Sequence, residues 1–161
     1  MAVLDLRIDD RLIHGQVVSF WIPYHKIDKI LIVDDAIVKD KFRQTALKFG
    51  TPSSVKLSFY DAATCADKLK RNLDRGSNVM VLCNGPRHLL EMYNEGYTFD
   101  KITVGNITPP KTAEYHIKKT LFLTEEDLSC FKQLIEKGVE VIVQIVPDDA
   151  PENLADLIRG I

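Results

Sequence analysis

Short runs of apolar and β-branched residues alternate with helical segments along the chain, and this alternation limits the fold more than any other sequence feature. In the helical segments the apolar residues recur at helical spacing, as expected for helices that cover a sheet. Helices that join strands in this way produce right-handed crossovers between parallel strands. The continuous apolar runs MVLC and VIVQIV are typical of strands buried on both faces. We therefore predict an α/β fold with an open, mostly parallel sheet of about seven strands and helices on both faces. The expected strands are Ala2–Ile8, Lys29–Val33, Val55–Tyr60, Asn78–Cys83, Lys101–Val104, Lys118–Leu123 and Val139–Val146.

Capping and helix-breaking residues set the expected helix boundaries. A helix from Gln16 to Ile22 is expected to stop at Pro23. Gly50 is expected to end a helix that spans Ile37–Phe49. Asp61 is expected to cap one helix, and Thr124 to begin a Thr-x-x-Asp capping box at the start of the next. Gly138 is expected to end that helix, and Pro151 to start the last one.

The size and charge of the chain narrow the function classes. Its 161 residues, 45% hydrophobic and 27% charged, fit one domain over residues 1–161 and exclude a disordered chain. A formal net charge of −2 provides no basic field for nucleic acid. No apolar run approaches the roughly 20 residues of a membrane span, and the acidic start MAVLDLRIDD differs from a signal peptide. Three cysteines and four scattered histidines lack metal-ligand spacing. We expect a cytoplasmic protein without a metal or cofactor.

In folds of this kind the functional site lies beyond the carboxyl ends of the parallel strands. The loop after the first expected strand carries two arginines, two aspartates and a histidine, at Arg7, Arg11, Asp9, Asp10 and His14. His14 directly precedes a helix, whose unpaired N–H groups suit an anion and favour a neutral imidazole. Such an imidazole beside guanidinium groups can attack a phosphoryl group. Two plainer interpretations remain open: a locally hydrogen-bonded histidine, and arginines that only pair with the neighbouring aspartates.

The segment RIDDRLIHGQVVSFW strongly resembles the region around the phosphorylated histidine in the enzyme IIB component of the mannose/fructose/sorbose family of the bacterial sugar phosphotransferase system. The resemblance continues through LIVDDAIVKD, VGNITPP and LTEEDLSCFKQLIEKGVEVIVQIVPDDAP, so it covers essentially the whole chain. It implies that His14 is phosphorylated at Nδ1 and that Arg7 and Arg11 face the phosphate. It also implies a protein-phosphohistidine–sugar phosphotransferase activity.

The same resemblance implies the partners. The donor is a phosphohistidine of a IIA domain, and the acceptor is a sugar held by the membrane IIC/IID components, which would keep the protein at the inner face of the membrane. The residues expected to bind phosphate are Gly15, Gln16, Asp10, Gly105 and Asn106. For Gly105 and Asn106 an ordinary turn is the alternative. The sugar and the formation of a homo-oligomer stay open.

Three other segments carry candidate chemistry. Asp34 and Asp35 could cap the helix near Ile37, accept hydrogen bonds from the loop arginines, or bind a metal. Cys83 lies within an expected strand, where burial makes a poor thiolate, so we reject it as a nucleophile. The loop Asn84–His88 could contact a partner through Arg87, or Arg87 could be a solvated charge.

Two other functions are alternatives to the phosphocarrier. One is a non-catalytic regulatory module that keeps the fold and binds a partner or an anion. The other is a nucleotide-binding module, which is disfavoured because no glycine-rich phosphate loop follows the first strand.

Overall fold

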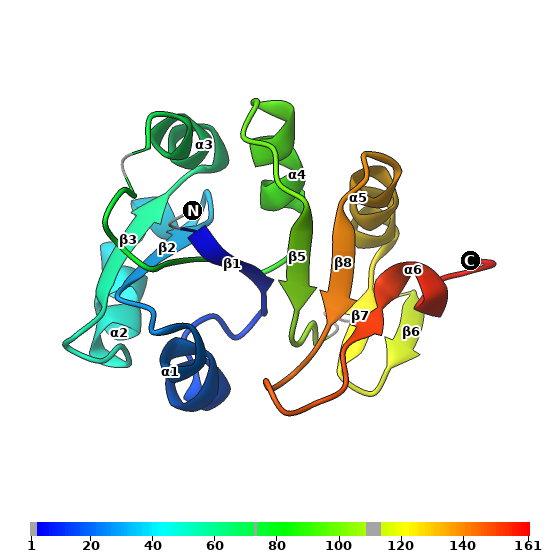
Figure 1. Ribbon diagram of the computed structural model, residues 1–161, viewed down its shortest axis with the longest axis horizontal. Coiled ribbons are helices and arrows are strands. Elements are labelled where there is room, and N and C mark those ends of the chain that lie inside the picture. Colours follow the sequence, from blue (N-terminus) through cyan, green and yellow to red (C-terminus); the bar gives the residue numbers. More distant parts are fainter. Residues whose placement is uncertain (1–2, 73, 109–113) are drawn as a thin grey trace.

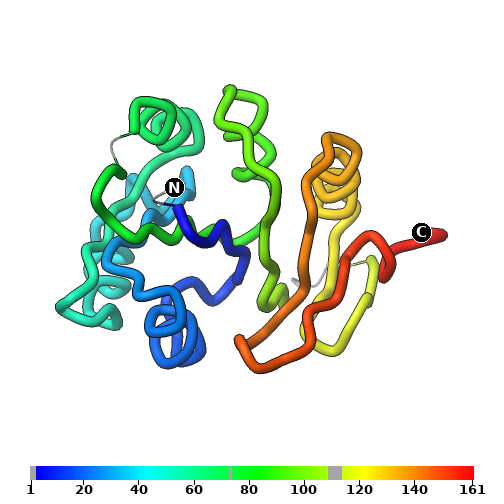
Figure 2. Tube along the Cα trace, viewed as in Figure 1, coloured from blue at the N-terminus to red at the C-terminus, as the bar shows by residue number. Residues whose placement is uncertain are grey.

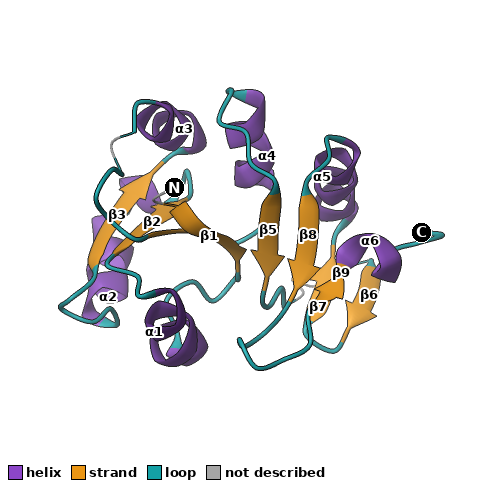
Figure 3. Ribbon diagram, in the orientation of Figure 1, coloured by secondary structure: helices purple, strands orange, loops and turns teal. Residues whose placement is uncertain are grey.

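The computed structural model describes residues 3–72, 74–108 and 114–161, and its central feature is one twisted sheet (Figures 1 and 3). Within the described residues, seven strands form this sheet in the order β3-β2-β4-β1-β5-β8-β9. All neighbouring strands pair in parallel except β8 and β9. The predicted fold class is confirmed. The strands are β1 (Val3–Ile8), β2 (Lys29–Val33), β3 (Lys56–Tyr60), β4 (Val79–Cys83), β5 (Lys101–Val104), β8 (Glu140–Val143) and β9 (Glu152–Asn153).

Helices cover both faces of the sheet, as expected. One face carries α3 (Ala62–Lys70), α4 (Arg87–Asn94) and α5 (Glu125–Glu136), at the top of Figure 1. The other face carries the π-helical turn η1 (Val17–Trp21), α1 (Ile22–His25), the 3-10 turn η2 (Ile37–Lys39) and α2 (Lys41–Phe49). The short α6 (Leu154–Leu157) follows β9. Within the described part of the chain, no helix is long and apolar enough to cross a membrane.

Alternation along the central strands divides the buried side chains between two cores. In β4, Val79, Val81 and Cys83 point into the larger core beneath α3, α4 and α5. Met80 and Leu82 point into the smaller core, which also contains residues of η1, α1 and η2. All five residues are fully buried. The run MVLC therefore lies in a strand that is buried on both faces, as predicted.

The expected strand Lys118–Leu123 is wrong. That segment contains a turn, which joins β6 (Tyr115–Lys118) to β7 (Leu121–Leu123) in a separate antiparallel pair. The two-residue turn at 119–120 brings a lysine and a threonine to the surface, where a continuous strand would place them in a ladder. The remaining strand of the main sheet is β9, which pairs with the edge of β8 and leaves less backbone unpaired there.

Neither of the two prolines predicted to mark a helix boundary does so. Pro23 does not stop the helix: it occupies the first turn of α1, where a missing N–H is tolerated, and the helix ends where Lys26 adopts a φ of 53°. Pro151 does not start the last helix. It precedes β9, and α6 begins at Leu154 with Asn153 as its cap.

Local capping signals were more reliable than the prolines. Asp61 accepts a hydrogen bond from the Thr64 N–H at 2.7 Å, and Thr124 forms the expected capping box with Asp127. The helix predicted over Ile37–Phe49 is interrupted, because Asp40 leaves helical geometry and caps α2 instead. Gly50 follows the last residue of α2, as expected.

Candidate functional site

The loop after β1 and the loop after β5 meet at the carboxyl edge of the sheet. The Gly105 N–H donates to the Ile8 carbonyl at 2.8 Å, and the Asp10 N–H donates to the Asn106 carbonyl at 2.9 Å. The two strands are neighbours although about a hundred residues separate them, and the trace in Figure 2 shows the end of β1 beside β5. The chain leaves β1 toward β2 on one side and continues from β5 toward β8 on the other. This is a switch point of the kind at which α/β sheets bind ligands.

The imidazole of His14 is held between a carboxylate and a backbone N–H group. Nε2 lies 3.0 Å from Oδ2 of Asp9, a contact with the length of a hydrogen bond but without its ideal direction. Nδ1 accepts a hydrogen bond from the Gln16 N–H at 3.3 Å. The side chain is 14% exposed. A proton on Nε2 faces the carboxylate, which leaves the Nδ1 lone pair at the start of the helical segment.

The carboxylate of Asp9 contacts both His14 and Arg11. It is 1% exposed and accepts hydrogen bonds from the Arg11 backbone N–H at 3.1 Å, from Arg11 Nε at 3.0 Å and from Arg11 Nη2 at 3.0 Å. Burial would raise the pKa of this carboxyl, but the neighbouring His14 ring and the Arg11 donors outweigh burial and hold the pKa below its usual value. The sequence indicates Asp9 only as an arginine partner, and no sequence signal indicates its contact with His14.

The Arg11 side chain joins Asp9 to Gln16 across the loop. Besides Asp9, its Nη2 donates to Oε1 of Gln16 at 2.8 Å, and its side chain is 39% exposed. The loop can turn this sharply because Leu12 has a φ of 57° while its side chain is 1% exposed in the smaller core. A positive φ is uncommon for leucine and here marks a loop whose shape is imposed by packing.

Arg7 lies beneath the loop, and both Nη atoms of its guanidinium donate hydrogen bonds, whereas its Nε is buried without a partner among the described residues. Its Nη2 donates to the carbonyls of Gln144 at 2.8 Å and Ile145 at 3.1 Å, and its guanidinium carbon lies 4.1 Å from the Trp21 ring centroid. Trp21 Nε1 also donates to the Ile145 carbonyl, at 2.8 Å. Burial lowers the pKa of Arg7 from its usual value. At 1% exposure this arginine supports the site from below, and its expected phosphate contact stays a prediction.

These contacts explain why the expected strand Val139–Val146 is shorter in the structure. β8 ends at Val143, although the Gln144 N–H still donates to the Val104 carbonyl at 2.9 Å. The next two carbonyls turn out of the ladder toward Arg7 and Trp21. No sequence pattern indicated that backbone after the last long strand would hold an arginine of the first.

Asp10 and Asn106 tie the two loops together. Oδ1 of Asp10 accepts from Nδ2 of Asn106 at 3.0 Å, and its Oδ2 accepts from the Thr108 N–H at 2.6 Å. Nδ2 of Asn106 also donates to Oγ1 of Thr108 at 2.6 Å. Their expected role in binding phosphate stays a prediction, while their observed contacts fix the loop after β5 against the loop after β1.

The two glycines of the predicted phosphate site differ in the space around them. A Cβ added at Gly105 would lie 2.6 Å from Oδ2 of Asp9 and 2.7 Å from Nη2 of Arg7, whereas a Cβ at Gly15 would meet nothing within 4 Å. Gly105→Ala is therefore expected to displace the buried carboxylate and cost about 1–3 kcal/mol of unfolding free energy, as overpacking commonly does. Gly15→Ala is expected to leave stability unchanged. Denaturant unfolding of both variants checks this, and equal stability would contradict it.

Two of the remaining candidates take structural positions. Oδ1 of Asp34 accepts from the N–H groups of Ala36 and Ile37 at 2.8 and 2.9 Å, which is the capping role. Its Oδ2 accepts from Nδ2 of Asn84 at 2.8 Å. Cys83 is buried in β4, and burial raises the pKa of its thiol well above the usual value, as expected for a poor nucleophile.

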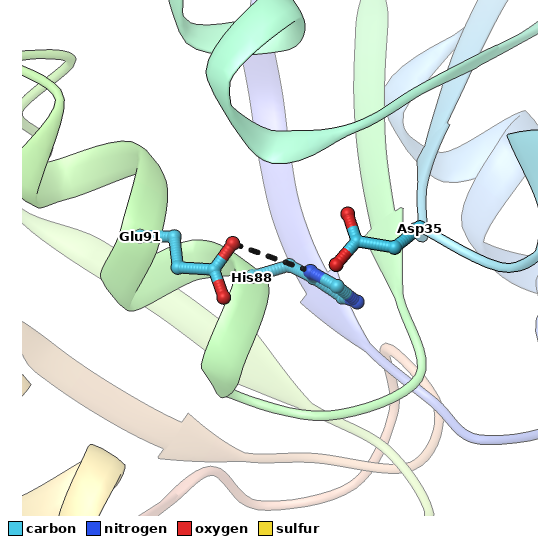
Figure 4. Close-up of side chains that lie close together, drawn as sticks. All are labelled: Asp35, His88 and Glu91. Carbon is cyan, nitrogen blue, oxygen red and sulfur yellow. Dashed lines mark ion pairs between the residues drawn. The ribbon is translucent and has the colours of Figure 1, made fainter.

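The segment Asn84–His88 contributes to a cluster in which Asp35, His88 and Glu91 bring ligand-type atoms within 4.8 Å of one another (Figure 4). Arg87 lies 3.7 Å from Asp35 and 3.5 Å from Glu91, so an arginine already balances these carboxylates. His88 is 3% exposed and is not presented to a partner, whereas half of the Arg87 side chain is exposed.

Similarity to known proteins places this chain in a family. A family model described as the PTS (phosphotransferase system) sorbose subfamily IIB component matches residues 3–160. The chain belongs to this IIB family. It is accordingly a IIB component of the sugar phosphotransferase system, and the family named from the sequence is confirmed.

Curated relatives and solved structures agree with this assignment. The fructose-specific EIIB component of Bacillus subtilis (strain 168) is 30% identical over 161 residues, covering all of this chain and 98% of that protein. A solved structure titled "phosphoenolpyruvate-dependent phosphotransferase system" superposes with a TM-score of 0.92 at 30% identity, covering 100% of this chain and 99% of that one. The IIB domain of the sorbose permease from Klebsiella pneumoniae superposes with a TM-score of 0.90 at 26% identity, covering 98% and 96%.

Proposed function

We propose that this IIB component carries a phosphoryl group on Nδ1 of His14, taking it from a phosphohistidine of a IIA domain and passing it to a sugar. The observation that carries the proposal is the orientation of the imidazole. The contact of Nε2 with Asp9 leaves Nδ1 at the start of the helical segment, next to the Gln16 N–H. A neutral ring whose lone pair points to the Gln16 N–H can attack phosphorus when that N–H turns to a phosphoryl oxygen instead.

In the transfer step, the Gln16 N–H releases Nδ1, whose lone pair forms a bond to phosphorus as the N–P bond of the donor breaks and its electron pair returns to the donor imidazole. The charge on the transferred group spreads over its equatorial oxygens, which preorganised donors must stabilise. The Gln16 N–H, which contacts Nδ1, and the partly exposed Arg11, whose Nη2 donates to Oε1 of Gln16, are candidates for these donors. Arg7 would act through the carboxylate of Asp9 and the loop after β8, because its guanidinium is buried.

The name of one relative supports the proposed donor. One relative is named as the mannose-specific EIIAB component of Escherichia coli (strain K12), and this chain covers 48% of it at 29% identity. Its name joins the IIA and IIB components, which supports a IIA donor for this chain. We extend the proposal to a membrane IIC/IID acceptor that holds the protein at the membrane. The relatives' names include fructose, sorbose, mannose and N-acetylgalactosamine, so similarity assigns no single sugar.

Phosphorylation of the purified protein tests this proposal. Incubation with phosphoenolpyruvate, the general phosphotransferase proteins and a IIA donor is expected to add one acid-labile phosphoryl group, measured by intact mass. A non-catalytic regulatory module with the same fold would gain none. Omission of IIA should abolish the gain, which separates a IIA donor from direct transfer by an upstream protein.

Arg11→Ala is expected to slow transfer from phosphorylated IIA by about 10²–10³-fold, as loss of one preorganised donor commonly does. Arg11→Lys is expected to recover only part of the rate, because an ammonium group cannot reproduce the two parallel bonds to Asp9. Single-turnover transfer rates provide the measurement. A wild-type rate in Arg11→Ala would reduce this arginine to a surface ion-pair residue.

Arg87 tests whether the Asn84–His88 loop contacts the donor. A charge reversal there would add a fourth acid to Asp35, Glu91 and Glu126, which surround the guanidinium at 3.5–3.9 Å. The neutral Arg87→Gln variant avoids that repulsion. If the loop docks IIA, this variant should raise the IIA concentration needed for half-maximal transfer several-fold and weaken its salt dependence. An unchanged concentration dependence would place the loop outside the interface.

A further inference from the structure

Helix α2 turns its aromatic residues away from the protein. Phe42 is 87% exposed and Phe49 is 93% exposed, and no residue of the helix is buried. Helices on a sheet normally bury their apolar stripe, so exposure of both phenylalanines on one short helix requires an explanation.

Helical geometry places these two residues on one face. They are seven positions apart, so their side chains leave the helix in directions that differ by only about 20°. Ala46 lies between them along the helix axis and is exposed. Gln44 and Leu47, on the opposite side of the helix, are the partly buried residues that face the protein. The outward face of α2 therefore presents Phe42 and Phe49, with Ala46 on one side of them and exposed Thr45 on the other.

Basic side chains border this face on both sides. By the same geometry Lys41 and Lys48 flank it on one side and Arg43 on the other, and all three are exposed. The Lys48 ammonium lies 5.8 Å from the ring centroid of Phe59, so it must leave this ring to reach a lipid phosphate. The helix sequence KFRQTALKF contains no acid, and Asp40 before it uses its carboxylate to cap the Arg43 N–H at 3.1 Å. An aromatic stripe between cationic borders is typical of a helix that lies at the interface of an anionic membrane.

We propose that the outward face of α2 binds the surface of an anionic lipid bilayer. The phenylalanines enter the headgroup region, and Lys41, Arg43 and Lys48 pair with lipid phosphates. The end of this helix adjoins the His14 loop, because a Cβ added at Gly50 would lie 3.6 Å from Cγ2 of Ile13. A protein docked through α2 therefore holds the His14 loop close to the membrane.

The charges argue for lipid over a second copy of this chain. A two-fold pairing would place the same three cations of each copy opposite one another, and like charges at an interface are costly. Two phenylalanines on a nine-residue helix also supply little of the roughly 1,200–2,000 Å² that stable interfaces bury. An anionic bilayer matches both the basic borders and the small aromatic stripe.

Vesicle sedimentation tests the proposal on the unphosphorylated full chain. The probes are vesicles of equal parts phosphatidylglycerol and phosphatidylcholine, and vesicles of phosphatidylcholine alone. We expect binding to the anionic vesicles that weakens with salt, and at least about tenfold weaker binding to the neutral ones. Phe42→Ser combined with Phe49→Ser is expected to reduce binding at least about tenfold. Both side chains are exposed, so the variant should fold like the wild type, which circular dichroism checks.

A matched pair of charge variants locates the contact. Lys41→Glu with Lys48→Glu and Arg71→Glu with Arg75→Glu change the net charge equally, but Arg71 and Arg75 are exposed at and beyond the end of α3, on the other face of the sheet. We expect the first pair to weaken binding much more than the second. Equal effects would attribute binding to net charge and overturn the assignment to α2.

Two further results would overturn the proposal: no binding to anionic vesicles at low salt, or binding that the double serine variant leaves unchanged. A concentration-dependent dimer that the serine variant dissolves, without vesicle binding, would make a second copy the occupant. The inference does not rest on the proposed phosphoryl transfer. Lipid binding can fail while His14 is still phosphorylated, and the reverse outcome is equally distinguishable.

Discussion

His14→Ala is expected to fold like the wild type and to accept no phosphoryl group from phosphorylated IIA. The imidazole is the proposed nucleophile, and the methyl group of alanine offers no lone pair in its place. The side chain is partly exposed, and Asp9 keeps its three hydrogen bonds from Arg11 without it. The free energy of unfolding should therefore change by about 1 kcal/mol or less. Intact mass after incubation with the donor system gives the phosphoryl content, and denaturant unfolding gives the stability.

His116→Ala serves as the control for this loss. That imidazole is exposed in β6, stacked on Phe122 with ring centroids 4.2 Å apart, and lies outside the two loops of the site. The His116→Ala variant should accept a phosphoryl group at the wild-type rate. Phosphorylation of His14→Ala with the same acid-labile product would show that another residue is the acceptor.

Asp9→Asn is expected to lower the transfer rate by about 10²–10⁴-fold while retaining the fold. The asparagine carbonyl, in the place of Oδ1, can still accept from the Arg11 N–H and Nε. Its NH₂ group, in the place of Oδ2, would face Nε2 of His14 and would lose the hydrogen bond from Arg11 Nη2. That NH₂ donor favours the ring tautomer whose proton is on Nδ1, which removes the proposed lone pair. An aspartate-to-asparagine change beside a catalytic histidine has a comparable effect in serine proteases. Single-turnover rates of transfer from phosphorylated IIA measure the loss.

The dependence on pH distinguishes positioning of His14 from a merely structural role for Asp9. The pKa of Asp9 is held below its usual value, so ionised Asp9 stabilises the fold at neutral pH. This stabilisation is complete above the unfolded-state pKa of about 3.9 and is lost as the pH falls through the lower folded-state pKa. Unfolding of Asp9→Asn should lack this acid-dependent component, and its rate defect should persist at neutral pH, where the fold is intact.

Asp61→Asn is the control for Asp9→Asn, because asparagine caps a helix about as well as aspartate does. It should retain both rate and stability. A wild-type transfer rate in Asp9→Asn would mean that the Asp9 carboxylate does not set the tautomer of His14.

The parts of the fold that could be predicted from sequence are set by residues that are close to one another in the chain. The bounds of β2 and β5 and the capping box at Thr124 follow from hydrogen bonds and side-chain periodicity within a few positions. The position of His14 at the carboxyl edge followed from its place after the first strand of a parallel sheet. Errors arose where a local signal had two outcomes, as at Pro23, which is as compatible with the first turn of a helix as with a helix end.

The sequence by itself determined the fold class, the family and the loop that carries His14, because periodicity, turn residues and the motif RIDDRLIHGQ are all local. Only the tertiary structure decided how the side chains of that loop divide their roles. It placed Gly105 against Asp9 and buried Arg7 under carbonyls 137 and 138 residues away. It also turned Phe42 and Phe49 outward on α2. These outcomes depend on which strands become neighbours and which helix face meets the sheet, and packing of the whole chain sets both.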